Sequence, residues 1–373
     1  MLDQQDAIIL ATARDTLQLA STAAERTGLS RVAVSRRIKK LADAGYLLRH
    51  GAGTRQTYSP GHLRFWLTTT TREAVAKAGG EFGVWEVHVA PLMQGVPDNV
   101  VNLANIAFTE MLNNALDHSQ ATHLLLGAHL TQTADGPAGG RLQMLVADDG
   151  VGIFRQIAQA LNLFDDRLAL LELAKGKFTT AASGHSGMGV FVSSRMLDGL
   201  AIDSRGLTFD LNPPQHALPR FDWVDVPGLL KPSSQGTVVR MDLALDTPRT
   251  AQDVYLRYFT PDEVGDEAFH TTEVPVRLAQ LSSHLISRSQ GKWVVERATQ
   301  FKTVILDFEG VTLVGQGFID EVFRVFATAH PLVNLKPVHL HPSVAQAMKM
   351  FAPHVTLPGI ATNATPLPAT DSA

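Results

Sequence analysis

The sequence predicts an α+β chain of several domains, on three observations. Its 373 residues exceed the usual size of one hydrophobic core. Segments with helical periodicity are interspersed with short strand-like runs along the chain. Hydrophobic residues make up 45% and charged residues 18%, as in folded proteins. We expect domains over 1–65, 80–246 and 270–357, and a disordered tail over 358–373, which is small, polar and Pro-rich.

The sequence contains no cysteine, which excludes disulfides, Cys-ligated zinc and thiol catalysis. The first ten residues, MLDQQDAIIL, place acidic residues before a short apolar run, unlike a signal peptide. No uninterrupted apolar segment reaches the ~18 residues that a membrane span needs. We therefore expect a cytoplasmic protein that does not enter a membrane.

Charge is distributed unevenly along the chain. The net charge is −4, yet residues 1–62 hold nine Lys/Arg and five Asp/Glu, a balance of +4, so the remainder carries −8. A basic N-terminal segment on an acidic body predicts a polyanionic partner for that segment alone.

Residues 22–47 have the pattern of two helices joined by a turn that contains glycine. Ser30 is a good N-cap for the second helix. In that helix Val34, Ile38 and Leu41 follow helical spacing and predict one buried stripe. The residues predicted to lie off the stripe are Arg31, Ser35, Arg36, Lys39 and Lys40.

The next segment, YLLRHGAGTRQTYS over 46–59, predicts two short strands about a glycine-rich turn. The whole pattern resembles the winged helix-turn-helix of bacterial regulators. That resemblance implies double-stranded DNA as partner, with the second helix in the major groove. Alternatives are a protein contact or a solvated basic face. Candidates for base edges are Arg31, Ser35 and Arg36, and for phosphates Lys39, Lys40 and Arg55.

A long helical pattern over 100–119 carries the first of four central motifs, FTEMLNNALDHS at 108–119. Glu110 and Asn114 are four residues apart and so lie on one helical face. An amide oxygen there can hold Mg²⁺ while the carboxylate orients a water or hydroxyl nucleophile. Such a pair is common in helices and means little alone.

The second motif, RLQMLVADDGVGI at 141–153, is an apolar strand that ends in Asp148, with Gly150 and Gly152 after it. Taken alone, its Asp-Gly pair could equally form a hairpin turn. The third, SGHSGMGVFVSSRML at 183–197, places glycines before an apolar helix, where backbone amides and the helix dipole favour phosphate oxygens. Its glycines are Gly184, Gly187 and Gly189.

The fourth motif is SQGTVVRMDLAL, in which Gly236-Thr237 opens a strand. Together the four resemble the GHKL (histidine-kinase-like) ATP-binding family, with its Bergerat-type α/β sandwich. The resemblance implies ATP and Mg²⁺ as cofactors. Asp148 would accept a hydrogen bond from the adenine amino group, with Glu110 as catalytic base and Asn114 on Mg²⁺. The glycines and Thr237 would support the nucleotide. Residues 153–184 would form an ATP lid, where Lys175 or Lys177 could touch phosphate but is rather expected to be a solvated loop charge.

From about residue 272 strand and helix patterns alternate. The strings SRSQ (287–290), LDFEGV (306–311) and GQGFIDEVFRVF (315–326) resemble the STAS-like domain of unknown function that follows GHKL modules in bacterial proteins. Related anti-anti-sigma proteins carry a phosphorylated serine at the head of the helix after this strand, where Gly315-Gln316-Gly317 stands here. Ser287 and Ser289 could accept phosphate or cap a helix. The resemblance suggests a protein partner for this domain.

Three functional hypotheses remain open. In the first, the chain is an ATP-binding DNA regulator, expected to hydrolyse ATP with Mg²⁺, whose nucleotide state controls the winged helix. The others are a protein serine kinase of the anti-sigma type, and an ATPase clamp or defence component that uses DNA as a sensor. A classical histidine kinase is disfavoured because no phosphoacceptor helix precedes the ATP motifs and His88 lies in a strand-like VWEVHVA. Helix-turn-helix proteins often pair on two half-sites, so a homodimer is compatible.

Overall fold

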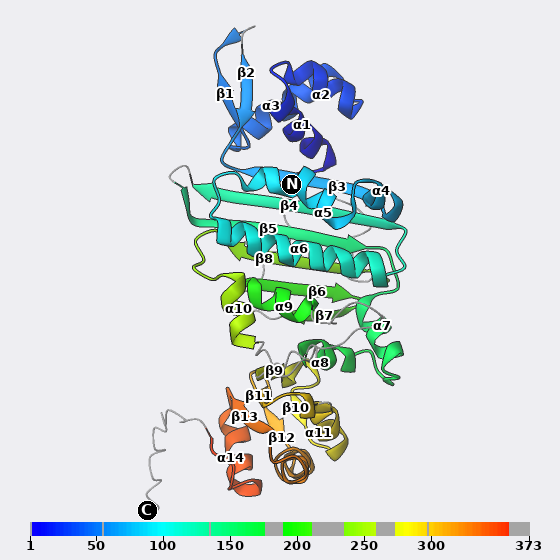
Figure 1. The fold of residues 1–373 in the computed structure, drawn as a ribbon, viewed down its shortest axis with the longest axis vertical. Helices are drawn as coiled ribbons and strands as arrows, with labels where there is room; N and C mark the ends of the chain where they lie inside the picture. Colours follow the sequence, from blue (N-terminus) through cyan, green and yellow to red (C-terminus); the bar gives the residue numbers. More distant parts are fainter. Residues whose placement is uncertain are drawn as a thin grey trace, which may run out of the picture. The chain divides into compact units, whose positions relative to one another are not determined.

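The computed structural model describes residues 2–53, 56–133, 136–175, 189–210, 235–258, 273–296 and 298–357. The chain divides into two compact units, Met1–Arg257 and Tyr258–Ala373 (Figure 1). The first contains the residues expected to form the domains 1–65 and 80–246. The second contains the STAS-like segment.

The N-terminal part of the first unit has three helices and a two-stranded antiparallel hairpin. The Ser30 hydroxyl accepts a hydrogen bond from the Ala33 amide at 3.2 Å, which confirms the expected N-cap. Val34, Ile38 and Leu41 are buried as expected. The elements are α1 (Gln4–Asp15), α2 (Leu19–Thr27), α3 (Arg31–Asp43), β1 (Leu47–His50) and β2 (Thr57–Pro60).

A six-stranded antiparallel sheet forms the centre of this unit. Its strand order, β3-β4-β5-β8-β6-β7, brings β8 beside β5 although 88 residues separate their facing ends, Asp148 and Thr237. The strands are β3 (Arg64–Thr71), β4 (His123–Thr133), β5 (Gly136–Asp148), β6 (Gly199–Ser204), β7 (Leu207–Asp210) and β8 (Thr237–Ala244).

Both faces of the sheet are used, because successive side chains of a strand point to opposite sides. Phe65 of β3 joins a core that also contains Ile9, Val34 and Leu47 from the N-terminal helices and hairpin. Its neighbour Trp66 instead contacts Phe108 of α6 (Asp98–His118), at 6.4 Å between ring centroids. Helix α6 lies along this second face together with α9 (Gly189–Met196), as Figure 1 shows.

The segment VWEVHVA is helical, so the strand expected around His88 is wrong. Trp85 packs against Phe108 with 6.1 Å between ring centroids, and Val89 is buried, so contact with α6 prevails over the strand preference of alternating apolar residues. The elements here are α4 (Arg72–Lys77), α5 (Gly80–Val84), a π-helical turn η2 (Trp85–Val89) and a 3-10 turn η3 (Ala90–Met93). Three further helices of the unit are α7 (Ile153–Ala160), α8 (Leu168–Lys175) and α10 (Ala251–Tyr258).

The second unit is a small α/β fold around a parallel sheet of order β13-β11-β9. Ser287 caps α11 by accepting the Gln290 amide at 3.2 Å, which supports the capping alternative for this serine. Strands are β9 (Glu273–Arg277), β10 (His284–Leu285), β11 (Thr303–Asp307), β12 (Leu313–Val314) and β13 (Asn334–Val338). Helices and helical turns are η5 (Leu278–Gln280), α11 (Arg288–Val295), η6 (Ala298–Gln300), α12 (Gln316–Asp320), η7 (Glu321–Phe326), α13 (Ala327–Ala329) and α14 (Pro342–Phe351).

None of the helices in the described ranges combines the length and the apolar character needed to cross a membrane. The tail over 358–373, expected to be disordered, lies outside the described residues.

Candidate functional site

The first motif lies on helix α6, which packs against the central strands β5 and β8. Residues such as Leu103, Phe108 and Leu112 are buried, whereas Glu110 and Asn114 lie on the half-buried side of the helix. This division follows from the 3.6-residue period, which places Glu110 and Asn114 one turn apart.

Asp148 ends β5 and lies opposite Thr237, the first residue of β8. It is 4% exposed, and its carboxylate accepts hydrogen bonds from the amides of Gly150 at 2.9 Å and Thr237 at 3.3 Å. Burial raises the pKa of Asp148 to about 6, and the charge of Asp149 adds to this rise, while the two amide bonds oppose it. Asp148 is therefore a desolvated carboxylate held in place by the backbone.

Glycines of the second and fourth motifs lie so close to neighbouring backbone that a side chain would not fit. A Cβ at Gly150 would collide with the Ser119 carbonyl oxygen, and one at Gly236 with the Asp148 carbonyl oxygen. Gly152 has φ +87°, in the left-handed region that favours glycine. Beyond it the Ile153 amide, which opens α7, donates to the Thr237 hydroxyl at 3.1 Å.

The first and third motifs meet where α9 begins. A Cβ at Gly189 would collide with Oε2 of Glu110 and would lie 3.7 Å from Nδ2 of Asn114. Nδ2 of Asn114 is buried and has no hydrogen-bond partner among the described residues. A buried amide donor without a partner is uncommon and calls for an explanation, such as a ligand.

Part of the expected site lies outside the described residues, namely Gly184, Gly187 and residues 176–184 of the expected lid. Lys175 is described, and it ends α8 with its side chain 3% exposed and 2.7 Å from Glu172. The expectation of a solvated loop charge is therefore wrong for Lys175, while Lys177 lies outside the described residues. An ammonium is tolerated in such a place when a carboxylate pairs with it.

The candidate nucleic-acid surface is the outer side of α3. Arg37 is not part of this surface, because its guanidinium donates to Asp3 and Asp6 of the α1 N-terminus at 2.7–2.9 Å. Burial alone would raise the pKa of Asp3, but these hydrogen bonds from Arg37 lower it. Arg55 lies outside the described residues. The remaining expected DNA contacts are all exposed: Arg31, Ser35, Arg36, Lys39 and Lys40.

Two contributors escaped the sequence interpretation. The Ser119 carbonyl accepts the Val151 amide at 2.9 Å and so ties the end of α6 to the loop after Asp148. Burial raises the pKa of Tyr255 on α10, and the nearby charge of Glu110 raises it further. Only the serine had a signal, since it is the last residue of the first motif.

The structure defines a mixed α+β protein with a six-stranded antiparallel sheet and a STAS-like C-terminal domain. Residues 290–345 match a protein family described as a STAS-like domain of unknown function (DUF4325). No curated protein and no solved structure matches the chain significantly.

Proposed function

We propose that the first unit binds ATP with Mg²⁺ and that its nucleotide state controls DNA binding by α3. One observation carries the nucleotide part of this proposal. The described parts of the four motifs, spread from residue 110 to residue 237, contact one another in pairs at glycines: Gly150 lies against Ser119, Gly236 against Asp148 and Gly189 against Glu110. The resemblance to GHKL domains assigns each motif a part of the nucleotide.

The adenine end of the proposed site is Asp148. Its carboxylate is already desolvated, so an adenine amino group would find an acceptor that does not have to shed water. Perturbed pKa values are frequent at functional sites, and the rise to about 6 fits that tendency. Gly150 and Gly152 leave the backbone open to the purine.

The phosphate end is the pair on α6 opposite the start of α9. Asn114 has an amide oxygen for Mg²⁺, and its buried Nδ2 would donate to a phosphate oxygen. The first turn of α9 presents amides and the positive end of a helix dipole. Glu110 borders Gly189 and would orient the nucleophile, so the same base serves hydrolysis and transfer to a protein serine.

The DNA part of the proposal depends on α3 and the hairpin. Five exposed polar or basic side chains occupy its outer side, while its inner side belongs to the core shared with β3, β4 and β5. Cations on an exposed helix neutralise phosphates and read base edges. The shared core provides a direct packing connection between α3 and the strand that ends in Asp148.

Calorimetry of the full-length chain with ATP and Mg²⁺ tests the nucleotide site. We expect Asp148→Asn to weaken binding roughly 10- to 150-fold, the loss of a charge-assisted hydrogen bond worth about 1.5–3 kcal/mol. Asp149→Asn is the matched control, since Asp149 instead accepts the Thr122 and His123 amides at 2.8 and 2.9 Å. Equal affinities in the two variants would refute the adenine assignment.

ATP labelled on its γ-phosphate distinguishes a chemical reaction from passive ATP binding. Incubation with and without duplex DNA, followed by measurement of free phosphate and labelled protein, distinguishes three outcomes. Free phosphate that responds to DNA supports the regulator. Labelled protein supports the alternative serine kinase, and neither product supports passive ATP binding.

A further inference from the structure

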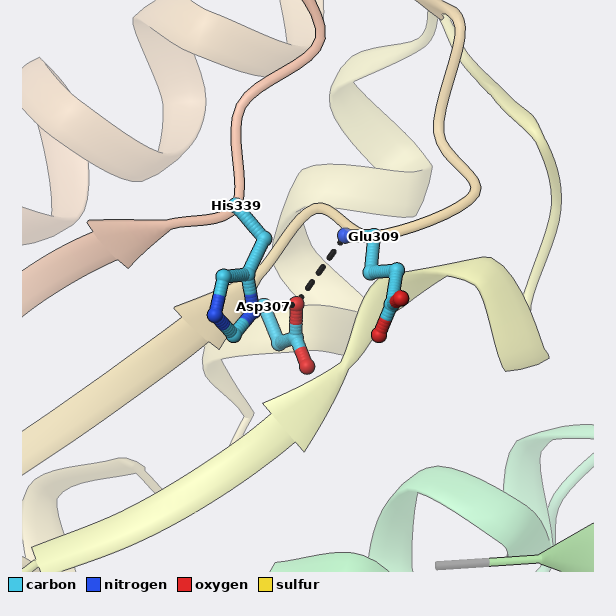
Figure 2. Close-up of side chains that lie close together, drawn as sticks. All are labelled: Asp307, Glu309 and His339. Atoms are coloured by element: carbon cyan, nitrogen blue, oxygen red, sulfur yellow. Dashed lines mark hydrogen bonds and ion pairs between the residues drawn. The ribbon is translucent and has the colours of Figure 1, made fainter. Parts of the chain in front are cut away.

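Three metal-ligating side chains meet in the second unit, at the carboxyl ends of the parallel strands β11 and β13 (Figure 2). Asp307 ends β11, Glu309 follows in the turn after it, and His339 follows β13. One ligand atom from each lies within 4.8 Å of the other two. Parallel pairing causes this meeting, because it brings the ends of both strands to one edge of the sheet.

Asp307 is the fixed member of this cluster. Its side chain is 12% exposed, and its Oδ1 accepts the Glu309 amide at 3.0 Å and lies 2.9 Å from Nδ1 of His339. The two strand ends are joined by the Phe308 amide, which donates to the Val338 carbonyl at 3.0 Å. The carboxylate therefore has a defined position, whereas the His339 side chain is 67% exposed and can reorient.

We propose that Asp307, Glu309 and His339 bind one divalent transition metal ion of the zinc class. The donor set is one imidazole nitrogen and two carboxylate oxygens, all of which zinc accepts at about 2.0–2.2 Å. Mg²⁺ and Ca²⁺ favour sites built of oxygen alone, so the imidazole selects against them.

The cluster needs a small rearrangement to bind the ion. Ligands about 2.1 Å from a tetrahedral zinc lie roughly 3.4 Å from one another. The Asp307 and His339 atoms, at 2.9 Å, are already closer than that. Rotation of the exposed His339 and Glu309 side chains supplies the adjustment around Asp307. Three protein ligands leave at least one coordination position for water or for a ligand from a partner.

The test uses the full-length chain, freed of metal with a chelator and kept without nucleotide. Calorimetric titration with Zn²⁺ should show one site that Mg²⁺ does not occupy. Titration with Co²⁺ should develop visible absorption that grows with the amount of Co²⁺ bound. His339→Ala and Glu309→Gln should each weaken Zn²⁺ binding at least tenfold and reduce the Co²⁺ absorption. His284→Ala, at an exposed histidine of the same unit, is the control and should bind as the parent does.

Unchanged Zn²⁺ affinity in His339→Ala and Glu309→Gln overturns the proposal, as does equal affinity for Mg²⁺. Either result would leave the Asp307–His339 hydrogen bond as a purely structural contact. Asp307→Asn is avoided because Asp307 holds the turn, and circular dichroism verifies that the two test variants remain folded. Since nucleotide is absent, the result is independent of whether the first unit binds ATP.

Discussion

The Tyr46 hydroxyl lies 2.9 Å from Nε2 of His129, and this buried contact joins the residue before the hairpin to strand β4. Burial raises the pKa of Tyr46 to about 12 and lowers that of His129 to about 4, so both groups are neutral near pH 7. The two rings stack, with 5.8 Å between centroids. The N-terminal helices and hairpin are thus connected to the sheet by a specific polar bond inside a shared apolar core.

We expect Tyr46→Phe to lower the free energy of unfolding by about 1–3 kcal/mol, because it leaves the buried Nε2 of His129 without its partner. Urea unfolding followed by circular dichroism measures the change. Tyr58→Phe on β2, where the tyrosine is only half buried, is the control and should lose less. Equal losses would show that the contact contributes nothing specific.

Adjacent arginines of α3 should separate folding from DNA binding. Arg37→Ala removes the partner of the buried Asp6, which is 1% exposed, and should cost about 1.5–3 kcal/mol of stability. Arg36→Ala changes an exposed residue and should leave stability within about 0.5 kcal/mol while weakening binding to duplex DNA. Thermal unfolding and fluorescence anisotropy measure the two effects. DNA affinity unchanged in Arg36→Ala at low and high salt would contradict the role proposed for α3.

The raised pKa of Asp148 predicts a pH dependence of stability. The folded-state pKa of about 6 exceeds the ordinary value of 3.8, so the protonated form favours folding. This contribution is complete below about pH 3.8 and is lost as the pH rises through 6. Relative to Asp148→Asn, the parent should therefore lose unfolding free energy between pH 4 and pH 6.

His129 makes stability depend on pH in the opposite direction over the same pH range. Burial lowers its pKa from 6.5 to about 4, so its contribution to stability is lost as the pH falls. The comparison with Asp148→Asn cancels that effect. Parallel stability curves for the parent and the variant would show that Asp148 titrates normally.

Two glycine substitutions should have different effects, one on stability and the other on ATP hydrolysis. Gly150→Ala drives a methyl group into the backbone oxygen of Ser119 and should lower stability by at least about 1–3 kcal/mol. Gly189→Ala meets only the end of the Glu110 side chain, which can move, so the protein should remain folded while phosphate release from ATP falls. Full ATPase activity in Gly189→Ala would argue against Glu110 as the base.

Asn114→Ala should separate ligand binding from stability. Its Nδ2 is buried without a partner among the described residues, so its removal relieves a desolvation cost and should leave the unfolding midpoint unchanged or higher. The Mg²⁺-dependent part of ATP affinity should disappear, as calorimetry with Mg²⁺ or with EDTA would reveal. A large loss of stability would instead mean that Asn114 has a structural role.

Local chemistry was readable from the sequence where neighbours along the chain decide the outcome. The Ser30 cap and the stripe of Val34, Ile38 and Leu41 follow from helix geometry alone. Glu110 and Asn114 share a helical side for the same reason. The assignments of ATP, Mg²⁺ and DNA remain predictions for the experiments above.

The features that the sequence did not reveal depend on distant packing. Trp85 becomes helical through its contact with Phe108, and Lys175 is buried because Glu172 pairs with it. The meeting of His339 with Asp307 depends on the parallel pairing of β11 with β13. No local pattern contains that information, since 31 residues separate the two side chains in the chain.

Residues of one interior come from both sides of the expected boundary near residue 65: Ile9 and Leu47 before it, Leu125 and Leu145 after it. Cutting the chain there would expose apolar surface on both fragments. The N-terminal helices and hairpin therefore cannot be transferred to another protein by themselves. Any sequence that borrows them must also supply the strand surface on which they rest.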